Sequence, residues 1–360
     1  MPTLPRLVVH VGLAQAGSTT LQRHVFNQIE FGFALLTLNR METIGKCLEL
    51  PLAGEFDAQQ SAHFFHRRFA EFQDESLVPV ISSEGLSDEF LEMEDNFHAE
   101  VHARRLREAF GRCKIILIIR EQASHLVSKY RKNLETKRRS NVALHAFLRD
   151  RPLGQRVQTD SDSVFLPILR HHSLVRLYWE LFGRENTLVL PFEMMSQQPA
   201  NFAKRLNTFC GSRIPPHFAF PRTNVHGARG LSSFYRAYNS VYSPMTISML
   251  WFLNPRRRWG RRWKGHASFV GRTSNSIQKR IVSLLRSARI VTDAKIARER
   301  EAQLMKVRRM LGDYFADSNQ LLSEMIGIDL AEFGYKTRGQ QAHSQNLDLH
   351  EKKIPIKIDN

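Results

Sequence analysis

The sequence predicts an α/β fold of three layers, with a central parallel sheet flanked by helices. Short apolar runs rich in β-branched residues recur along the chain, and longer stretches with helical spacing separate them. Continuous apolar runs of this kind are typical of strands covered on both faces. We expect strands near residues 7–11, 77–82, 114–119 and 187–191. This alternation places ligands beyond the carboxyl ends of the strands.

The helices between these strands follow from the spacing of apolar residues. Leu21, Val25 and Ile29 recur at helical intervals and predict one buried face of a helix after the first strand. Residues 196–209 predict a helix that ends near Gly211. With 360 residues, of which 42% are hydrophobic, the chain can bury one large core.

The first strand runs directly into a loop between two glycines, Gly12 and Gly17, and then into a helix start at Ser18. The first N–H groups of a helix have no carbonyl partner and bind phosphate, while glycines let the backbone bend around it. The hydroxyls of Ser18 and Thr19 add donors. The glycine spacing is that of a P-loop, so it predicts a P-loop-like fold that binds an anionic nucleotide. The alternative is an ordinary glycine-containing turn.

In a P-loop, lysine follows the second glycine, whereas Ser18 follows Gly17 here. The segment resembles the 5′-phosphosulfate loop of bacterial-type sulfotransferases, which use 3′-phosphoadenosine 5′-phosphosulfate. That family's loop reads Gly-x-x-Lys-Thr/Ser-Gly-Ser/Thr-Thr, and Gln15 stands at its lysine position. The resemblance assigns the catalytic lysine position to Gln15. It assigns cofactor binding to Gly12, Ala14, Ala16, Gly17, Ser18, Thr19 and Thr20.

A second segment resembles the 3′-phosphate site of the same family. Arg120 follows the apolar run 114–119, and Ser128 lies in the predicted helix behind it, at the spacing of the family's motif. Arginine offers phosphate a forked pair of donors, and serine adds a hydroxyl. Glu121 and Gln122 stand where the family usually has Asp-Pro. A proline there would only stiffen the turn, so this difference is compatible with the resemblance.

Further resemblances follow in the family's order over residues 5–335. Glu84 ends a predicted strand as in many bacterial members, and Glu193 follows a later strand. Arg229 and Gly230 resemble a cofactor-clamping pair late in the family. Their shared order carries more weight than any one of them.

The resemblance also sets the expected domain boundaries. We expect one sulfotransferase domain over residues 1–335, with a basic, aromatic insertion at 240–265. Residues 336–360 are polar and lack periodicity, which predicts a flexible tail.

The activity implied by the resemblance is in-line transfer of a sulfuryl group to a hydroxyl or amine of a carbohydrate, lipid or small-molecule acceptor, without a metal. A base must take the acceptor's proton. Glu84 is the candidate, because it ends a strand and related enzymes use glutamate or histidine near the acceptor. Alternatively, Glu84 caps the next segment or binds an arginine. His125 and His226 stay open as bases, whereas His10 lies inside an apolar strand and is expected to be structural.

Gln15 bears on activity, because the family's lysine places a positive charge beside the leaving oxygen and an amide supplies none. Either another cation takes over, for example Arg23, or the chain is a catalytically impaired relative that still binds nucleotide. A P-loop kinase is the third hypothesis. The missing lysine after Gly17 opposes it, and so does the pair of Arg120 and Ser128, since ATP has no 3′-phosphate.

The net charge of +17 is concentrated in clusters at residues 129–139 and 256–264. The first cluster either attracts an anionic cofactor or substrate or forms a solvated helix face. The second belongs to a segment that begins at Met245 with an apolar run and ends at Lys264, with tryptophans between its arginines. This combination is typical of a membrane interface, and the run is shorter than the roughly 20 residues that span a bilayer. The alternative is an internal helix. Nucleic-acid binding ranks last, because no known module is present.

The three cysteines, Cys47, Cys113 and Cys210, lack the spacing of a disulfide framework or a zinc site. We expect packed thiols in a reducing compartment. The amino terminus has no apolar signal core, which favours a cytoplasmic location. Residues 245–264 add the hypothesis of peripheral contact with the inner face of the membrane.

Overall fold

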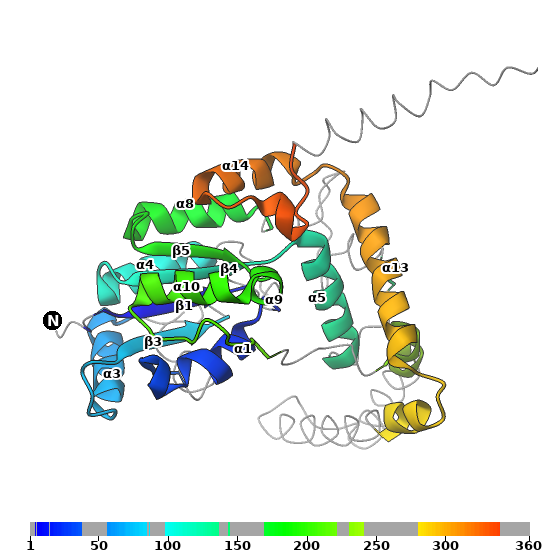
Figure 1. The fold of residues 1–360 in the computed structure, drawn as a ribbon, viewed down its shortest axis with the longest axis horizontal. Coiled ribbons are helices and arrows are strands. Elements are labelled where there is room, and N and C mark those ends of the chain that lie inside the picture. The colour runs from blue at the N-terminus through cyan, green and yellow to red at the C-terminus, as the bar shows by residue number, and fades with distance from the viewer. Residues whose placement is uncertain are drawn as a thin grey trace, which may run out of the picture. The chain divides into compact units, whose positions relative to one another are not determined.

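The computed structural model describes residues 4, 6–13, 15–37, 56–84, 86, 98–136, 143–144, 169–221, 230–240 and 280–338 (Figure 1). These residues belong to two compact units. The first unit draws on residues 1–122, 165–223 and 311–360, and the second on residues 123–164 and 224–310. In the part of the chain so described, no helix is long and apolar enough to cross a membrane.

A parallel sheet of five strands forms the centre of the first unit, in the order β2-β3-β1-β4-β5. The expected strands are confirmed with shifts of no more than one residue, and β1 lies in the middle. The sequence did not predict β2, because an apolar run of three residues does not stand out from a helical pattern. The strands are β1 (Val8–Gly12), β2 (Phe33–Leu35), β3 (Val78–Ser83), β4 (Lys114–Ile119) and β5 (Thr187–Pro191).

Helices cover both faces of the sheet, which confirms the three-layer α/β architecture (Figure 1). On one face the helices pack in a row, each on the next, and α8 also contacts β4 and β5. This row is α3 (Ala58–Ala70), α4 (His98–Phe110), α8 (His171–Phe182) and α14 (Ala316–Ile326). The other face carries α1 (Ser18–Leu21), the π-helical segment η1 (Gln22–Phe26) and α10 (Pro199–Cys210).

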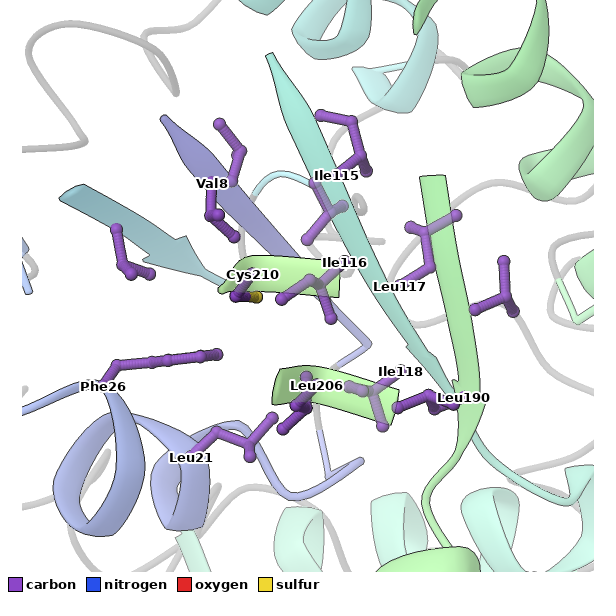
Figure 2. Close-up of a cluster of buried hydrophobic side chains, with 14 of the residues drawn as sticks. Val8, Leu21, Phe26, Ile115, Ile116, Leu117, Ile118, Leu190, Leu206 and Cys210 are labelled. Atoms are coloured by element: carbon purple, nitrogen blue, oxygen red, sulfur yellow. The ribbon is translucent and has the colours of Figure 1, made fainter. Parts of the chain in front are cut away.

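The core between β4 and the second helical layer anchors the elements that follow the glycine loop. Figure 2 shows Leu21 and Phe26 gathered with Leu206 near Ile116 and Ile118 of β4. All five side chains are fully buried. Burying an aliphatic or aromatic side chain contributes about 2 kcal/mol. This packing therefore fixes α1 and η1 against the sheet, just behind the loop.

Two helix predictions were wrong in detail. The helix expected at 196–209 is two helices, α9 (Met194–Gln197) and α10, with Gln198 outside helical geometry between them. Pro199 explains the break, because the residue before a proline disfavours helix. Ile29 does not share a buried face with Leu21 and Val25: it is 55% exposed. The wider π-helical winding of η1 changes the spacing, and Phe26 is buried instead.

The second unit contains α5 (Gln122–Thr136) without its first residue and α13 (Asp293–Leu311) without its last residue. Arg131 of α5 is buried and pairs with Glu299 of α13 at 3.0 Å. It also donates to the Ser232 hydroxyl and the Gly230 carbonyl. Arg131 therefore holds this unit together. Of the two interpretations of the 129–139 cluster, the solvated helix face therefore does not hold for Arg131.

The end of the described chain lies on the first unit. A short 3₁₀ helix, η4 (Leu330–Phe333), follows α14. Beyond it, Lys336 pairs with Asp313, and Arg338 pairs with Asp317.

Candidate active site

Gly12, Glu84 and Arg120 lie at the carboxyl-terminal end of three neighbouring strands. The three residues share this end of the sheet because β3, β1 and β4 are parallel. Gly12 ends β1 and pairs with Ile118 of β4, so Arg120 follows β4 next to the glycine loop. Ser83 pairs with Val11, so Glu84 follows β3 on the other side of β1. Glu84 and Arg120 are buried there. The geometry brings Gly12, Glu84 and Arg120 together as the sequence predicted.

Both glycines of the loop occupy positions where a side chain does not fit. Gly17 has φ +84°, a conformation that other residues rarely adopt, and a Cβ there would lie 2.9 Å from the Phe192 ring. A Cβ on Gly12 would lie 2.3 Å from the Ser18 hydroxyl. Gln15, between them, also has a positive φ of 66°. The loop therefore turns tightly over the end of β1 before α1 begins at Ser18.

Arg120 contacts the loop through its guanidinium, whose Nη1 donates to the backbone carbonyl of Gln15. The guanidinium also lies 4.7 Å from the centre of the Phe192 ring, a cation–π arrangement. Phe192 in turn packs against Gly17. The arginine predicted for the 3′-phosphate thus contacts the loop predicted for the 5′-phosphosulfate. Arg23, named above as a replacement cation, is exposed on η1.

The hydroxyls of α1 differ in their surroundings. The Thr20 hydroxyl donates to the Pro221 carbonyl at 2.9 Å, so a ligand would meet Thr20 through its backbone N–H. Ser18 is 1% exposed, and its hydroxyl has no hydrogen-bond partner among the described residues. Buried hydroxyls usually have one. The Ser18 hydroxyl therefore has an unused capacity to donate a hydrogen bond, which an anion could take.

Phe192 and Glu193, directly after β5, contact Arg120 and the residue after it, and sequence reasoning predicted neither contact. Glu193 was recognised only as an acidic residue following a strand. Its carboxylate accepts the backbone N–H of Glu121 at 3.1 Å and the Tyr335 hydroxyl at 3.4 Å. It therefore fixes the turn that carries Arg120. Burial raises the pKa of Glu193 to about 7. One sequence signal could have indicated these two residues: an aromatic residue and an acid come directly after a predicted strand. That strand, β5, pairs with β4, the strand that precedes Arg120.

The raised pKa of Glu193 makes the unfolding free energy depend on pH. An unfolded glutamate releases its proton near pH 4.3, whereas the folded one holds it to about pH 7. The folded state therefore binds more protons across that window, and the unfolding free energy falls as pH rises through it, by at most about 4 kcal/mol. We expect Glu193→Gln to remove this fall. Chemical denaturation of both proteins at pH 5 and pH 8 measures it. Exposed Glu301→Gln is the control, and equal pH profiles for Glu193→Gln and wild type would contradict the assignment.

Ser128 lies on α5 in the second unit, so its pairing with Arg120 stays a prediction. Gly230 also belongs to the second unit, where its carbonyl accepts from Arg131. His125 is buried in the same unit. The remaining predictions fall outside the described residues: Ala14, His226, Arg229, Cys47 and the basic, aromatic segment 245–264.

The cysteine prediction is confirmed for Cys113 and Cys210, which are buried thiols. Burial raises the pKa of each to about 12, so neither is reactive at neutral pH. Within the described ranges, no group of three or more histidine, cysteine or acidic side chains is placed to hold a metal ion.

Comparisons with known proteins bear on this site. The family model described as "Sulfotransferase domain" matches residues 5–220, which include the glycine loop, Glu84, Arg120 and Glu193. Among solved structures, the chain is similar to a sulfotransferase from Alicyclobacillus acidocaldarius, with 16% sequence identity and a TM-score of 0.41. The match covers 71% of this chain and 97% of that one. No curated protein matches.

Proposed function

This chain belongs to the sulfotransferase family and is a transferase, and on that premise we propose that it transfers a sulfuryl group from 3′-phosphoadenosine 5′-phosphosulfate to a hydroxyl or amine. One observation carries the choice of donor: the Arg120 guanidinium contacts the backbone of the glycine loop. A nucleotide with phosphates at both ends of its ribose needs two anion sites close together. The loop and Arg120 supply them.

The residues of the loop fit the 5′ end of this donor. Gly12 and Gly17 let the backbone pass where a Cβ would clash with the Ser18 hydroxyl and the Phe192 ring, and the buried Ser18 hydroxyl lacks a partner among the described residues. When bound, the donor supplies an activated sulfuryl group whose leaving group is the 5′-phosphate. The Ser18 hydroxyl and the N–H groups that open α1 stabilise the negative charge that grows on that phosphate.

The other roles fall to Arg120 and Glu84. Arg120 binds the 3′-phosphate with its forked donors and orients the nucleotide away from the reacting centre. Its cation–π contact with Phe192 keeps the guanidinium ordered. Glu84 takes the proton of the acceptor as the new sulfur–oxygen or sulfur–nitrogen bond forms. The acceptor class, whether carbohydrate, lipid or small molecule, is left open by these residues.

Gln15 supports a second candidate, a relative that binds the nucleotide without efficient turnover. Its amide supplies no charge beside the leaving oxygen, where the family has lysine. Membership of the family sets the kinase hypothesis aside.

Calorimetric binding of 3′-phosphoadenosine 5′-phosphate and of ADP tests the donor class without knowledge of the acceptor. We expect the 3′-phosphorylated nucleotide to bind at least about tenfold more tightly, because only it engages Arg120. Equal affinity for ADP would overturn the proposed donor. Release of radiolabelled sulfate from the donor then separates an active enzyme from a relative that only binds.

A further inference from the structure

His10 lies on the central strand β1 and is fully buried, with its ring packed against that of Phe26 at 5.5 Å between centres. Its Nδ1 lies 2.7 Å from the Ser82 hydroxyl. Its Nε2 is buried and has no hydrogen-bond partner among the described residues. A buried polar atom without a partner is costly, which points to a hydrogen bond that forms only when a ligand binds.

Gln22 fixes the direction of the hydrogen bonds around His10. Its amide nitrogen lies 3.3 Å from the Ser82 backbone oxygen and 3.0 Å from the Ser82 hydroxyl. Because a backbone oxygen only accepts, the nitrogen end of the Gln22 amide must face Ser82 and donate. The Ser82 hydroxyl therefore accepts from Gln22. Among the described residues, the hydroxyl has no acceptor within hydrogen-bond distance other than Nδ1 of His10, so its own hydrogen points to Nδ1. The neutral ring then carries its proton on Nε2.

The Nε2 edge of His10 lies beside the phosphate loop. A Cβ on Gly12 would be 3.0 Å from Cε1 and 3.2 Å from Nε2 of His10, and 2.3 Å from the Ser18 hydroxyl. The ring edge and the hydroxyl thus share the space that a side chain at residue 12 would fill. Both polar atoms are buried, and both lack a partner among the described residues.

We propose that His10 is a positioning residue for the nucleotide: when the 5′-phosphate binds, the His10 Nε2–H donates to the Ser18 hydroxyl and turns the serine hydrogen toward the phosphate. The two side chains do not make this hydrogen bond in the structure. The donors then run in one direction, from Gln22 through Ser82, His10 and Ser18 to the anion. This inference rests on the proposed function and adds a residue to it.

The environment of His10 favours this role over that of a cation or a base. Burial lowers its pKa to about 3, so the ring is neutral at physiological pH and has one N–H to donate. Hydrogen bonds in such a chain strengthen one another when an anion sits at its end. The chain thereby adds donor strength to a loop in which Gln15 contributes no charge.

Replacing His10 with Gln or with Asn tests whether a hydrogen-bond donor is needed at the position of Nε2. The Gln amide nitrogen reaches the position of Nε2, whereas the shorter Asn amide reaches only that of Nδ1. We expect His10→Asn and His10→Phe to weaken binding of 3′-phosphoadenosine 5′-phosphate about tenfold, and His10→Gln to stay within about threefold of wild type. Adenosine 3′-phosphate, which lacks the 5′-phosphate, should bind all of these proteins equally.

A double-mutant cycle with Ser18→Ala tests whether His10 acts through Ser18. We expect the second substitution, His10→Phe, to add less than about twofold once the serine hydroxyl is gone. Thermal unfolding checks that each variant is folded. If His10→Phe does not fold, the comparison of His10→Asn with His10→Gln still tests whether a donor at Nε2 supports nucleotide binding.

Three outcomes would overturn the inference. Equal losses for the two nucleotides would show a merely structural histidine. Fully additive effects of the two substitutions would show that His10 does not act through Ser18. Equal binding by His10→Gln and His10→Asn would remove the requirement for a donor at Nε2. If wild-type protein itself binds 3′-phosphoadenosine 5′-phosphate no better than ADP, the proposed function fails, and this inference fails with it.

Discussion

Arg120→Ala is expected to lower the affinity for 3′-phosphoadenosine 5′-phosphate by at least about 30-fold, or about 2 kcal/mol. Arg120 is 6% exposed, stacked on Phe192 and bonded to the loop backbone, so its guanidinium is held in place before the nucleotide arrives. Removing it leaves a buried phosphate without its paired charge, which is costly. Calorimetry measures the loss directly.

Two further variants separate charge from geometry at Arg120. Arg120→Lys keeps the charge but lacks the fork, so we expect an intermediate loss. Arg104→Ala removes the same charge from α4, where the side chain is 64% exposed and pairs with Glu100, and should leave affinity unchanged. The assignment would be wrong if Arg120→Ala bound the nucleotide as tightly as Arg104→Ala. ADP affinity should change less than that of the 3′-phosphorylated nucleotide in Arg120→Ala.

The sequence predicted the sheet and the loop well because both follow from local patterns. The segment 114–119 has five consecutive apolar residues between Lys114 and Arg120, and it forms β4 with the predicted limits. Both loop positions require glycine for local reasons. Gly12 lies against the Ser18 hydroxyl, and Gly17 adopts a left-handed backbone conformation. Arg120 follows β4 by chain continuity, so its place at the sheet edge needed no long-range information.

The parts that the sequence did not predict depend on contacts between distant segments. Phe192 stacks on Arg120, and Tyr335 donates to Glu193 across much of the chain. His10 was expected to be structural, because strand patterning shows burial but cannot show that one ring nitrogen lacks a partner. The charge pattern at 129–139 is compatible with a solvated helix face, whereas Arg131 in the structure pairs with Glu299 of a helix remote in sequence.

Gln15 is another residue whose surroundings the sequence did not predict. The identity of its side chain predicts its charge but not the contacts of its backbone. The neutral amide pointed to a missing cation, with Arg23 as the suggested substitute. The structure instead places Arg120 on the Gln15 carbonyl and leaves Arg23 exposed. A cation is therefore present at the loop, but it binds the backbone and lies on the side predicted for the 3′-phosphate.

Gln15→Lys is expected to raise the turnover of 3′-phosphoadenosine 5′-phosphosulfate by at least about tenfold. A donor or charge beside a leaving oxygen is worth on the order of 10²–10³ in rate in other enzymes, and the resemblance places the family's lysine at this position. The left-handed conformation of residue 15, φ +66°, strains lysine no more than glutamine. Slow transfer to water, followed as release of 3′-phosphoadenosine 5′-phosphate, measures turnover without the acceptor.

Gln73 offers a matched control for this substitution. It has the same residue type and the same left-handed backbone, with φ +52°, but is exposed between α3 and β3. Gln73→Lys therefore adds the same charge with the same backbone strain, away from the loop, and should leave turnover unchanged. An unchanged rate in Gln15→Lys as well would mean that Arg120 and the donors of the loop already supply all the stabilisation that the leaving oxygen can use. The absence of the lysine would then carry no catalytic cost, and the impaired-relative hypothesis would lose its basis.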